Sequence, residues 1–242
     1  MKHLAFIIIS ILIFNNRLIA QNDSDVKGPE QGKIYFAPLP VLMANPSFGF
    51  MYGVAASTSV FTGDPSNTRM STSLGSLTYS TKKQFMFTFK SNVYLPEDNW
   101  VLLGDWRYFD TSQPTFGLGT GPQSAKLAPG SGIEYEGGMF SDPVPGAQLA
   151  EFKYIRFHET VFKKLKEYIY AGIGYHYDYH FNIVDNLLDL EAIPPVITSH
   201  YAYSIDKGFD PEKYILSGIS LNGMYDSRDN AANPYEGRYA LV

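Results

Sequence analysis

The 242-residue chain contains no cysteine, which excludes structural disulfides and a lipid anchor on a cysteine. Charged residues make up only 18% of it, and 24 acidic residues stand against 19 basic ones, a balance that gives no support for nucleic-acid binding. After residue 20, no apolar run approaches the roughly 20 residues that a transmembrane helix needs. If the chain lies in a membrane, it must therefore cross it as β-strands.

The first twenty residues have the pattern of a cleaved secretory signal peptide. Lys2 provides a positive start, Leu4 to Phe14 is an almost unbroken apolar run, and Ala20 is a small residue at the expected cleavage site. Export of a chain without cysteine is typical of a bacterial envelope. The expected organisation is a signal peptide, a short N-terminal tail and a folded domain, at residues 1–20, 21–32 and 33–242.

Aromatic residues are abundant, with 18 Tyr and 17 Phe, and most of the chain alternates between apolar and polar residues. A period of two places neighbouring side chains on opposite faces of a β-strand, and polar turns with Gly and Pro separate the segments. The sequence predicts nine strands, at 33–43, 48–61, 70–79, 84–95, 100–109, 150–162, 168–182, 213–225 and 238–242. It also predicts long loops at 111–148 and 183–210, and a tight basic turn at 163–167.

The seventh predicted strand indicates what surrounds these strands. Its two faces differ sharply, since Tyr175, Tyr177, Tyr179 and Phe181 oppose His176, Asp178, His180 and Asn182. A soluble β-sandwich also alternates, but one face of each strand must then join a core, and this polar face is too polar for one. Lipid is the simplest environment for the aromatic face. We therefore predict an all-β fold, a transmembrane antiparallel β-barrel.

The polar side chains of the alternating strands are expected to face the lumen of that barrel. They are Lys90, Asp105, Arg107, His176, Asp178 and His180. The long loops follow the fifth and seventh predicted strands, and bacterial barrels have long loops outside and short turns in the periplasm. The turns after the second, fourth, sixth and eighth strands are therefore expected on the periplasmic side.

The most distinctive stretch follows the eighth predicted strand and reads Tyr225-Asp-Ser-Arg-Asp-Asn-Ala-Ala-Asn-Pro-Tyr-Glu-Gly237. It resembles the D-x-R-D-N-x-x-x-P-x-x-G signature in barrels of the BamA/TamA superfamily, the bacterial surface-antigen family. The stretches 78–85 and 114–119 are also similar to members of that family. The resemblance covers about residues 33–242, and the matching turn residues are Asp226, Arg228, Asp229, Asn230, Pro234 and Gly237.

The resemblance implies an outer-membrane location and a role in outer-membrane assembly or protein translocation. It also implies a sixteen-stranded barrel, of which this chain has about the first half, without the POTRA repeats or the Arg-Gly-Phe/Tyr loop of the family. Lipid cannot satisfy the unpaired edges of an open sheet. We expect a truncated chain whose partner is the missing half; a narrower closed barrel and an assembly of copies are the alternatives.

Two clusters could carry chemistry. His176, Asp178 and His180 lie on one strand face with His158 on the next strand, but residues i and i+4 of a strand are about 13 Å apart, so a polar lumen lining is favoured over a metal site. Arg228 with its neighbouring aspartates could form an ion-pair knot or a docking point, although a turn held by local hydrogen bonds is favoured.

No active site can be defined from residue spacing, so neither catalysis nor a cofactor is expected. Gly117 and Gly119 form G-x-G without a following helix pattern, which disfavours a nucleotide loop. Trp100, Trp106 and Tyr108 could bind a ligand, but an aromatic belt or lipid-facing wall is favoured. The expected partners are outer-membrane lipid and, as substrates, outer-membrane or secreted proteins. A passive pore or structural envelope barrel, and a secreted soluble β-sandwich that binds a ligand, are the alternative functions.

Overall fold

The computed structural model describes residues 28–117, 132–135, 139–144, 146–231 and 233–242. The expected signal peptide and the expected tail up to residue 27 lie outside these residues, as does Gly119. Residues Gln31–Val242 form one compact unit, which contains all the strands.

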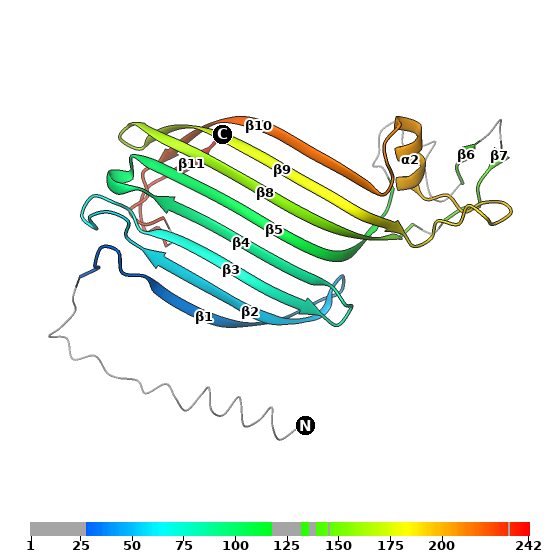
Figure 1. Ribbon diagram of the computed structural model, residues 1–242, viewed down its shortest axis with the longest axis horizontal. Coiled ribbons are helices and arrows are strands. Elements are labelled where there is room, and N and C mark those ends of the chain that lie inside the picture. The colour runs from blue at the N-terminus through cyan, green and yellow to red at the C-terminus, as the bar shows by residue number, and fades with distance from the viewer. Residues whose placement is uncertain (1–27, 118–131, 136–138, 145, 232) are drawn as a thin grey trace, which may run out of the picture. The chain divides into compact units, whose positions relative to one another are not determined.

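Nine strands form a single antiparallel sheet in the order β1-β2-β3-β4-β5-β8-β9-β10-β11 (Figure 1). Their bounds are β1 Tyr35–Asn45, β2 Gly49–Val60, β3 Ser71–Ser80, β4 Phe85–Tyr94, β5 Trp100–Thr115, β8 Gln148–Lys166, β9 Ile169–Asp185, β10 Lys213–Asp226 and β11 Tyr239–Leu241. A separate hairpin pairs β6 (Glu134–Tyr135) with β7 (Met139–Phe140). The helical segments are the short 3-10 helix η1 (Pro96–Asp98) and α2 (Ser199–Lys207). None of the described helices is long and apolar enough to cross a membrane.

The all-β prediction is confirmed, but β5, β8 and β9 are longer than predicted by two residues or more. The register of β5 and β8 runs without interruption from Thr115↔Gln148 to Trp100↔Lys163, so the first long loop is shorter at both ends. Lys163 to Lys166 therefore belong to β8, and the prediction of a basic turn at 163–167 is wrong. The chain reverses at Glu167 and Tyr168 instead, where Tyr168 has a φ of 65°.

The second long loop contains a helix that the sequence patterns did not predict. Thr198 caps the N-terminus of α2 by accepting a hydrogen bond from the backbone N of Tyr201, at 3.3 Å. Gly208 ends the helix with a left-handed φ of 68°, and the N–H of Phe209 bonds the carbonyl of Ser204 at 2.7 Å. The helix depends on these two caps rather than on a strong apolar periodicity.

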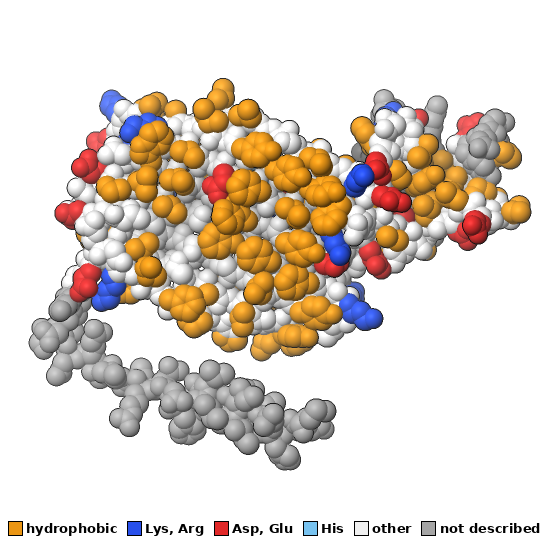
Figure 2. Space-filling model, viewed as in Figure 1, with side chains coloured by type: hydrophobic (Ala, Val, Ile, Leu, Met, Phe, Trp, Pro, Cys, Tyr) orange, Lys and Arg blue, Asp and Glu red, His pale blue; other side chains and the backbone are white. Residues whose placement is uncertain are grey.

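The sheet has one aromatic face and one polar face, because residues paired in register lie on the same side. Phe89 pairs with Trp106, Trp106 with Phe157, and Phe157 with Tyr177, which places these four rings in one row. Figure 2 shows that hydrophobic side chains gather over the strands on one side of the sheet. We call this side the aromatic face and the opposite side the polar face.

A small core lies on the polar face at the end of the sheet where the turns after β2, β4, β8 and β10 meet. Its buried members are Tyr94, Val101, Phe162, Tyr170 and Met224, with Leu103 and Ala231 packed against them. Val101 and Phe162 are each 0% exposed. The four turns expected on the periplasmic side thus lie at one end of the sheet, and α2 and the β6–β7 hairpin lie at the other (Figure 1).

The strands β1 and β11 stand at the two ends of the sheet order. β11 pairs only with the last three residues of β10, from Met224 to Asp226. Among the described residues, no strand therefore covers the outer edge of most of β10, and none covers that of β1.

Candidate functional site

The turn with the family signature is a loop that connects β10 to β11 and is organised around Asp229. Its Oδ1 accepts hydrogen bonds from the backbone N–H groups of Asn230, Tyr235 and Glu236 at 2.9, 3.0 and 3.1 Å. Asn230 holds the next part of the loop, because its Oδ1 accepts from the N–H of Asn233 at 3.1 Å. These contacts account for an aspartate and an asparagine at successive positions of the signature.

Gly237 closes the loop at a position that no other residue fits. Its φ is +101°, and an added Cβ would lie 2.3 Å from the carbonyl oxygen of Ser227 and 2.6 Å from the Cα of Arg228. A side chain would therefore collide with backbone that cannot move aside. Pro234 lies between these anchors and is exposed.

Asp226 and Arg228 form a bidentate ion pair at the start of the loop. Nε of Arg228 donates to Oδ1 of Asp226 at 2.8 Å, and Nη2 donates to Oδ2 at 2.9 Å. Nη1 of Arg228 also donates to the carbonyl of Ala231 at 3.1 Å, and the guanidinium stacks over the ring of Tyr239 at 4.2 Å. The pair is thus local in sequence, but its carboxylate is 0% exposed and has a further partner.

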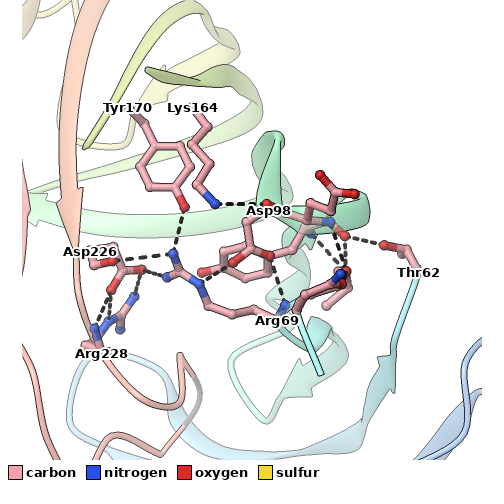
Figure 3. Close-up of polar contacts among 12 residues, drawn as sticks. Thr62, Arg69, Asp98, Lys164, Tyr170, Asp226 and Arg228 are labelled. Atoms are coloured by element: carbon pink, nitrogen blue, oxygen red, sulfur yellow. Dashed lines mark hydrogen bonds and ion pairs between the residues drawn. The ribbon is translucent and has the colours of Figure 1, made fainter. Parts of the chain in front are cut away.

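That further partner is Arg69, in the turn between β2 and β3 (Figure 3). Its Nη1 lies 2.7 Å from Oδ2 of Asp226, its Nε donates to Oδ2 of Asp98 at 2.7 Å, and its Nη2 donates to the hydroxyl of Tyr170 at 2.7 Å. We call these five residues the Arg69 knot: Arg69, Asp98, Tyr170, Asp226 and Arg228. Because they come from separate turns and strands, the signature is more than a turn held by local hydrogen bonds.

The knot is largely buried, which decides its energetics. The side chain of Arg69 is 15% exposed and that of Asp98 is 9% exposed, and the Arg69 guanidinium also lies 5.0 Å from the ring centre of Tyr94. Burial alone would lower the pKa of Arg69, but its hydrogen bond to Asp98 and the charges of Asp98 and Asp226 raise it above its usual range. Arg69 is therefore a permanent cation between two carboxylates, and removing it would leave Asp98 buried without its cation and Asp226 with Arg228 alone.

Further hydrogen bonds join the turns that the knot connects. The Oγ1 of Thr68 accepts from the N–H of Glu97 at 2.9 Å, and Nζ of Lys164 donates to the carbonyl of Glu97 at 3.0 Å. Thr62 donates through its Oγ1 to the carbonyl of Tyr94. The turns after β2, β4 and β10 and the end of β8 are therefore fixed to one another around Arg69.

No sequence pattern pointed to Arg69, Asp98 or Tyr170 as site residues. Arg69 and Asp226 are 157 positions apart, and Arg69 stands in an ordinary polar turn. Only the sheet order, which brings alternate turns to one end, places the two together. The unusual run of Asp, Arg and Asp at the end of β10 was the sequence signal for this site. It identified two of the five knot residues, Asp226 and Arg228.

A second polar cluster lies on the polar face, along the middle of β5, β8 and β9. Arg107 forms two bonds with Asp105, at 2.7 and 2.5 Å, and Arg156 lies 3.8 Å from Asp105 and 3.0 Å from Asp178. Tyr154 donates to Asp178 as well. Lys90 is paired in register with Asp105 and is exposed. Arg107 and Arg156 are paired in register, and the carboxylates of Asp105 and Asp178 offset their two positive charges.

Asp178 also begins a hydrogen-bonded chain through two imidazoles to Ser220. Nε2 of His158 is 2.7 Å from Oδ2 of Asp178, the two Nδ1 atoms of His158 and His176 are 3.2 Å apart, and Nε2 of His176 is 2.9 Å from Oγ of Ser220. Since Asp178 already accepts bonds from Tyr154 and Arg156, its carboxylate is an acceptor, and Nε2 of His158 must donate. With neutral rings, His176 then donates through Nδ1 and accepts from Ser220 through Nε2.

These groups do not form a metal centre. Within the described ranges, no set of three or more His, Cys, Asp or Glu side chains is placed to hold a metal ion. His180, which shares the polar face with His176 and Asp178, does not join their chain. Its ring stacks on Tyr214 at 4.5 Å and 16°, and its Nδ1 is buried without a hydrogen-bond partner.

Comparisons with protein-family models, with curated proteins and with solved structures find no match for this chain. The resemblance to the BamA/TamA superfamily therefore stays a prediction that rests on the signature residues quoted above.

Replacing Arg69 by Ala should lower the free energy of unfolding by about 3–5 kcal/mol, because Asp98 and Asp226 lose their shared cation in a buried position. Arg107→Ala is the matched control, since its side chain is 26% exposed and its ion pair with Asp105 is partly screened by solvent; we expect a loss of about 1 kcal/mol or less. Denaturant unfolding followed by tryptophan fluorescence measures both. Equal losses in the two variants would contradict the central role of Arg69.

The loop should open in acid through Asp229. The hydrogen bond from Glu236, with those from Tyr235 and Asn230, lowers the pKa of the Asp229 carboxyl below its ordinary value of 3.8. A depressed folded-state pKa stabilises the loop above the unfolded value, and this contribution is lost as the pH falls through the folded pKa.

Hydrogen exchange at the amides of Tyr235 and Glu236, corrected for intrinsic rates, should show constant protection from pH 7 to pH 5. Protection should then decrease as the pH falls below 3.8, the ordinary pKa of an aspartate carboxyl. Asp229→Asn keeps an acceptor oxygen but does not titrate, so its protection should not change with pH. The same acid transition in both proteins would assign it to another group.

Proposed function

We propose that this chain is an outer-membrane β-barrel protein of a bacterial envelope, related to the BamA/TamA surface-antigen family, and that it acts in outer-membrane assembly or protein translocation. Residues 1–20 serve as its export signal. The observation that carries the proposal is the aromatic face, a broad apolar surface that nothing covers among the described residues.

Large apolar side chains on this face are exposed to a degree that water disfavours. Val54 is 60% exposed, Ile173 61%, Ile219 78% and Leu221 83%. Soluble monomers seldom present contiguous apolar patches beyond a few hundred Å², and larger ones mark contacts with membranes or proteins. Hydrocarbon is the environment in which this surface is stable.

The height of the apolar band fits a bilayer. On β8 and β5, charged residues flank the band: Lys163 lies over the ring of Trp100 at 4.6 Å near one end, and Lys153 lies 3.7 Å from Asp110 near the other. Ten residues separate Lys153 from Lys163, about 33 Å along a strand. At the strand tilt of about 40° usual in membrane barrels this is about 25 Å, the height of their apolar band.

One acidic residue, Glu159, lies inside this band. It is paired in register with Gly104, and its Oε1 accepts a hydrogen bond from Nε1 of Trp106 at 2.8 Å. An added Cβ at Gly104 would lie 2.8 Å from that Oε1, so the glycine provides the space that the carboxylate occupies. The Trp106 hydrogen bond reduces the number of polar groups presented to lipid at this point.

The alternative of a soluble β-sandwich has less support. In a sandwich, a second sheet packs on the apolar face of the first. The only other sheet in the described part of the chain is the two-stranded β6–β7 hairpin. A passive pore is compatible with the same polar face, and it differs from the assembly role in activity rather than in architecture.

The open edges of β1 and β10 support a partner in the membrane. Unpaired N–H and C=O groups cost several kcal/mol each in hydrocarbon, so these edges require further strands. In the proposal these strands come from the second half of a sixteen-stranded barrel. The polar face then lines the lumen, and the Arg69 knot fixes the periplasmic turns.

Membrane contact is tested by two variants, each of which introduces an arginine on a different face of β10. Ile219 and Leu216 are 78% and 60% exposed, so Arg at either position would cost little in water. In a bilayer, Ile219→Arg on the aromatic face should cost about 2–4 kcal/mol and Leu216→Arg on the polar face about 0–1 kcal/mol. Unfolding in lipid vesicles and flotation of the vesicles give the comparison. Equal stability of the two variants would refute the proposal that the aromatic face contacts lipid.

The assembly role is tested with vesicles that contain the purified protein. They should accelerate folding of a second, urea-unfolded outer-membrane barrel protein by at least fivefold over empty vesicles. Vesicles carrying the Arg228→Ala variant should lose part of that acceleration, because the signature loop loses its bond to Asp226. Ion conductance without any acceleration would favour the passive pore and contradict a role in assembly.

A further inference from the structure

A cavity of about 580 Å³ opens on the polar face beside α2, at the end of the sheet opposite the Arg69 knot. We call it the α2 pocket. Its walls come from the end of β5, from β8, β9 and the start of β10, and from the helix itself. The size falls within the range of small-molecule sites, which is about 300–1,000 Å³.

One wall of the pocket is a row of rings across three strands. His180 lies between Phe152 of β8, at 5.6 Å, and Tyr214 of β10, at 4.5 Å, and it is nearly parallel to Tyr214. Nδ1 of His180 is buried without a hydrogen-bond partner, and one face of the imidazole is covered by Tyr214. Because these rings stack on one another, the row presents ring edges, which favour edge-to-face contact with another ring.

The opposite wall is carried by α2, whose position is fixed by buried hydrogen bonds. The side chain of Gln148, which is 1% exposed, accepts from the N–H of Ser199 at 2.7 Å and donates to its Oγ at 3.0 Å. Asp185 accepts from Thr198 at 2.8 Å and contacts Nδ1 of His200 at 3.0 Å. The helix is therefore anchored at its N-terminal end, and the pocket is preformed.

The described lining carries exposed aromatic surface, and among the described residues it contains no Asp, Glu, Lys or Arg. The carboxylate of Asp185, beside His200, is already paired. Phe116 is 71% exposed, Tyr203 38% and Tyr214 40%. Exposed apolar area of this kind is unfavourable in water unless a ligand covers it.

From these observations we infer that the α2 pocket binds an uncharged, planar aromatic small molecule, which packs edge-to-face against the row formed by Phe152, His180 and Tyr214 and contacts Tyr203. The absence of charged lining groups disfavours anionic and cationic ligands, since no counter-charge would replace their lost hydration. Tyr203, Tyr214 and Gln113, which line the pocket, carry hydrogen-bonding groups. The inference does not depend on lipid contact or on a role in barrel assembly.

The probe is benzophenone, an uncharged aromatic ketone that forms covalent adducts on irradiation. The full-length mature protein is irradiated with it in detergent micelles, and adducts are mapped by peptide mass spectrometry. We expect adducts on the segments that carry Tyr203 and Tyr214. Benzamide, an uncharged planar aromatic compound, should reduce them at least fivefold, whereas the anion benzoate at the same concentration should not.

Two variants and one control decide the location. Ala150→Trp fills the pocket from β8, and Tyr203→Ala removes the ring on α2; each should reduce the pocket adducts at least fivefold. Ala171→Trp makes the same change as Ala150→Trp, but at an exposed position on the aromatic face, and should leave these adducts unchanged. Heat-modified mobility on a gel confirms that each variant is folded.

Adducts that persist in both pocket variants, that occur only on the aromatic face, or that benzoate suppresses as well as benzamide does would overturn the inference. Failure of the protein to enter vesicles would overturn the proposed membrane role instead, and would leave specific labelling of the pocket intact.

Discussion

The structure depends on a single buried cation, the guanidinium of Arg69. It forms ion pairs with two carboxylates, those of Asp98 and Asp226, which are far apart in the chain. It also donates a hydrogen bond to the hydroxyl of Tyr170. Beneath it lie the buried rings and aliphatic side chains of the core. An ion pair in such a position contributes little beyond the cost of desolvating its members, but it is intolerant of losing any one of them. The knot therefore specifies which turns meet, and the core beneath it supplies the apolar burial.

The rest of the sheet follows from an alternation that gives each strand two different environments. Aromatic and aliphatic side chains gather on one face, while on the other Asp105, Arg107, Arg156 and Asp178 neutralise one another. The histidine chain from Asp178 to Ser220 extends this network without reaching the metal-binding arrangement that its composition would allow. A surface of self-compensated polar groups suits an aqueous lumen, and an uncompensated apolar surface suits lipid. The α2 pocket departs from this division, because it places uncovered rings on the polar side.

Much of the fold could be predicted from local patterns, because strand faces and turns depend on short stretches of sequence. The strand β4 matched its prediction within one residue at each end, and the loop after β10 was recognised by its run of Asp, Arg, Asp and Asn. Predictions were wrong where pairing overrode local composition. Lys163 to Lys166 look like a turn, yet register with β5 and β9 keeps them in β8. The helix α2 was missed because its caps, Thr198 and Gly208, carry a weaker signal than an apolar period.

The sequence by itself determined the all-β class, the two strand faces and two of the knot residues, Asp226 and Arg228, since each depends on residues within a few positions of one another. Only the tertiary structure added Arg69, Asp98 and Tyr170 to the knot. Arg69 meets Asp226 because the sheet order brings alternate turns to one end. His158 meets His176, and His180 meets Tyr214, because neighbouring strands fix their register. The physical reason is that a strand specifies which way a side chain points but not what it will face. That partner is selected by the order in which strands pair, which depends on the whole sheet at once.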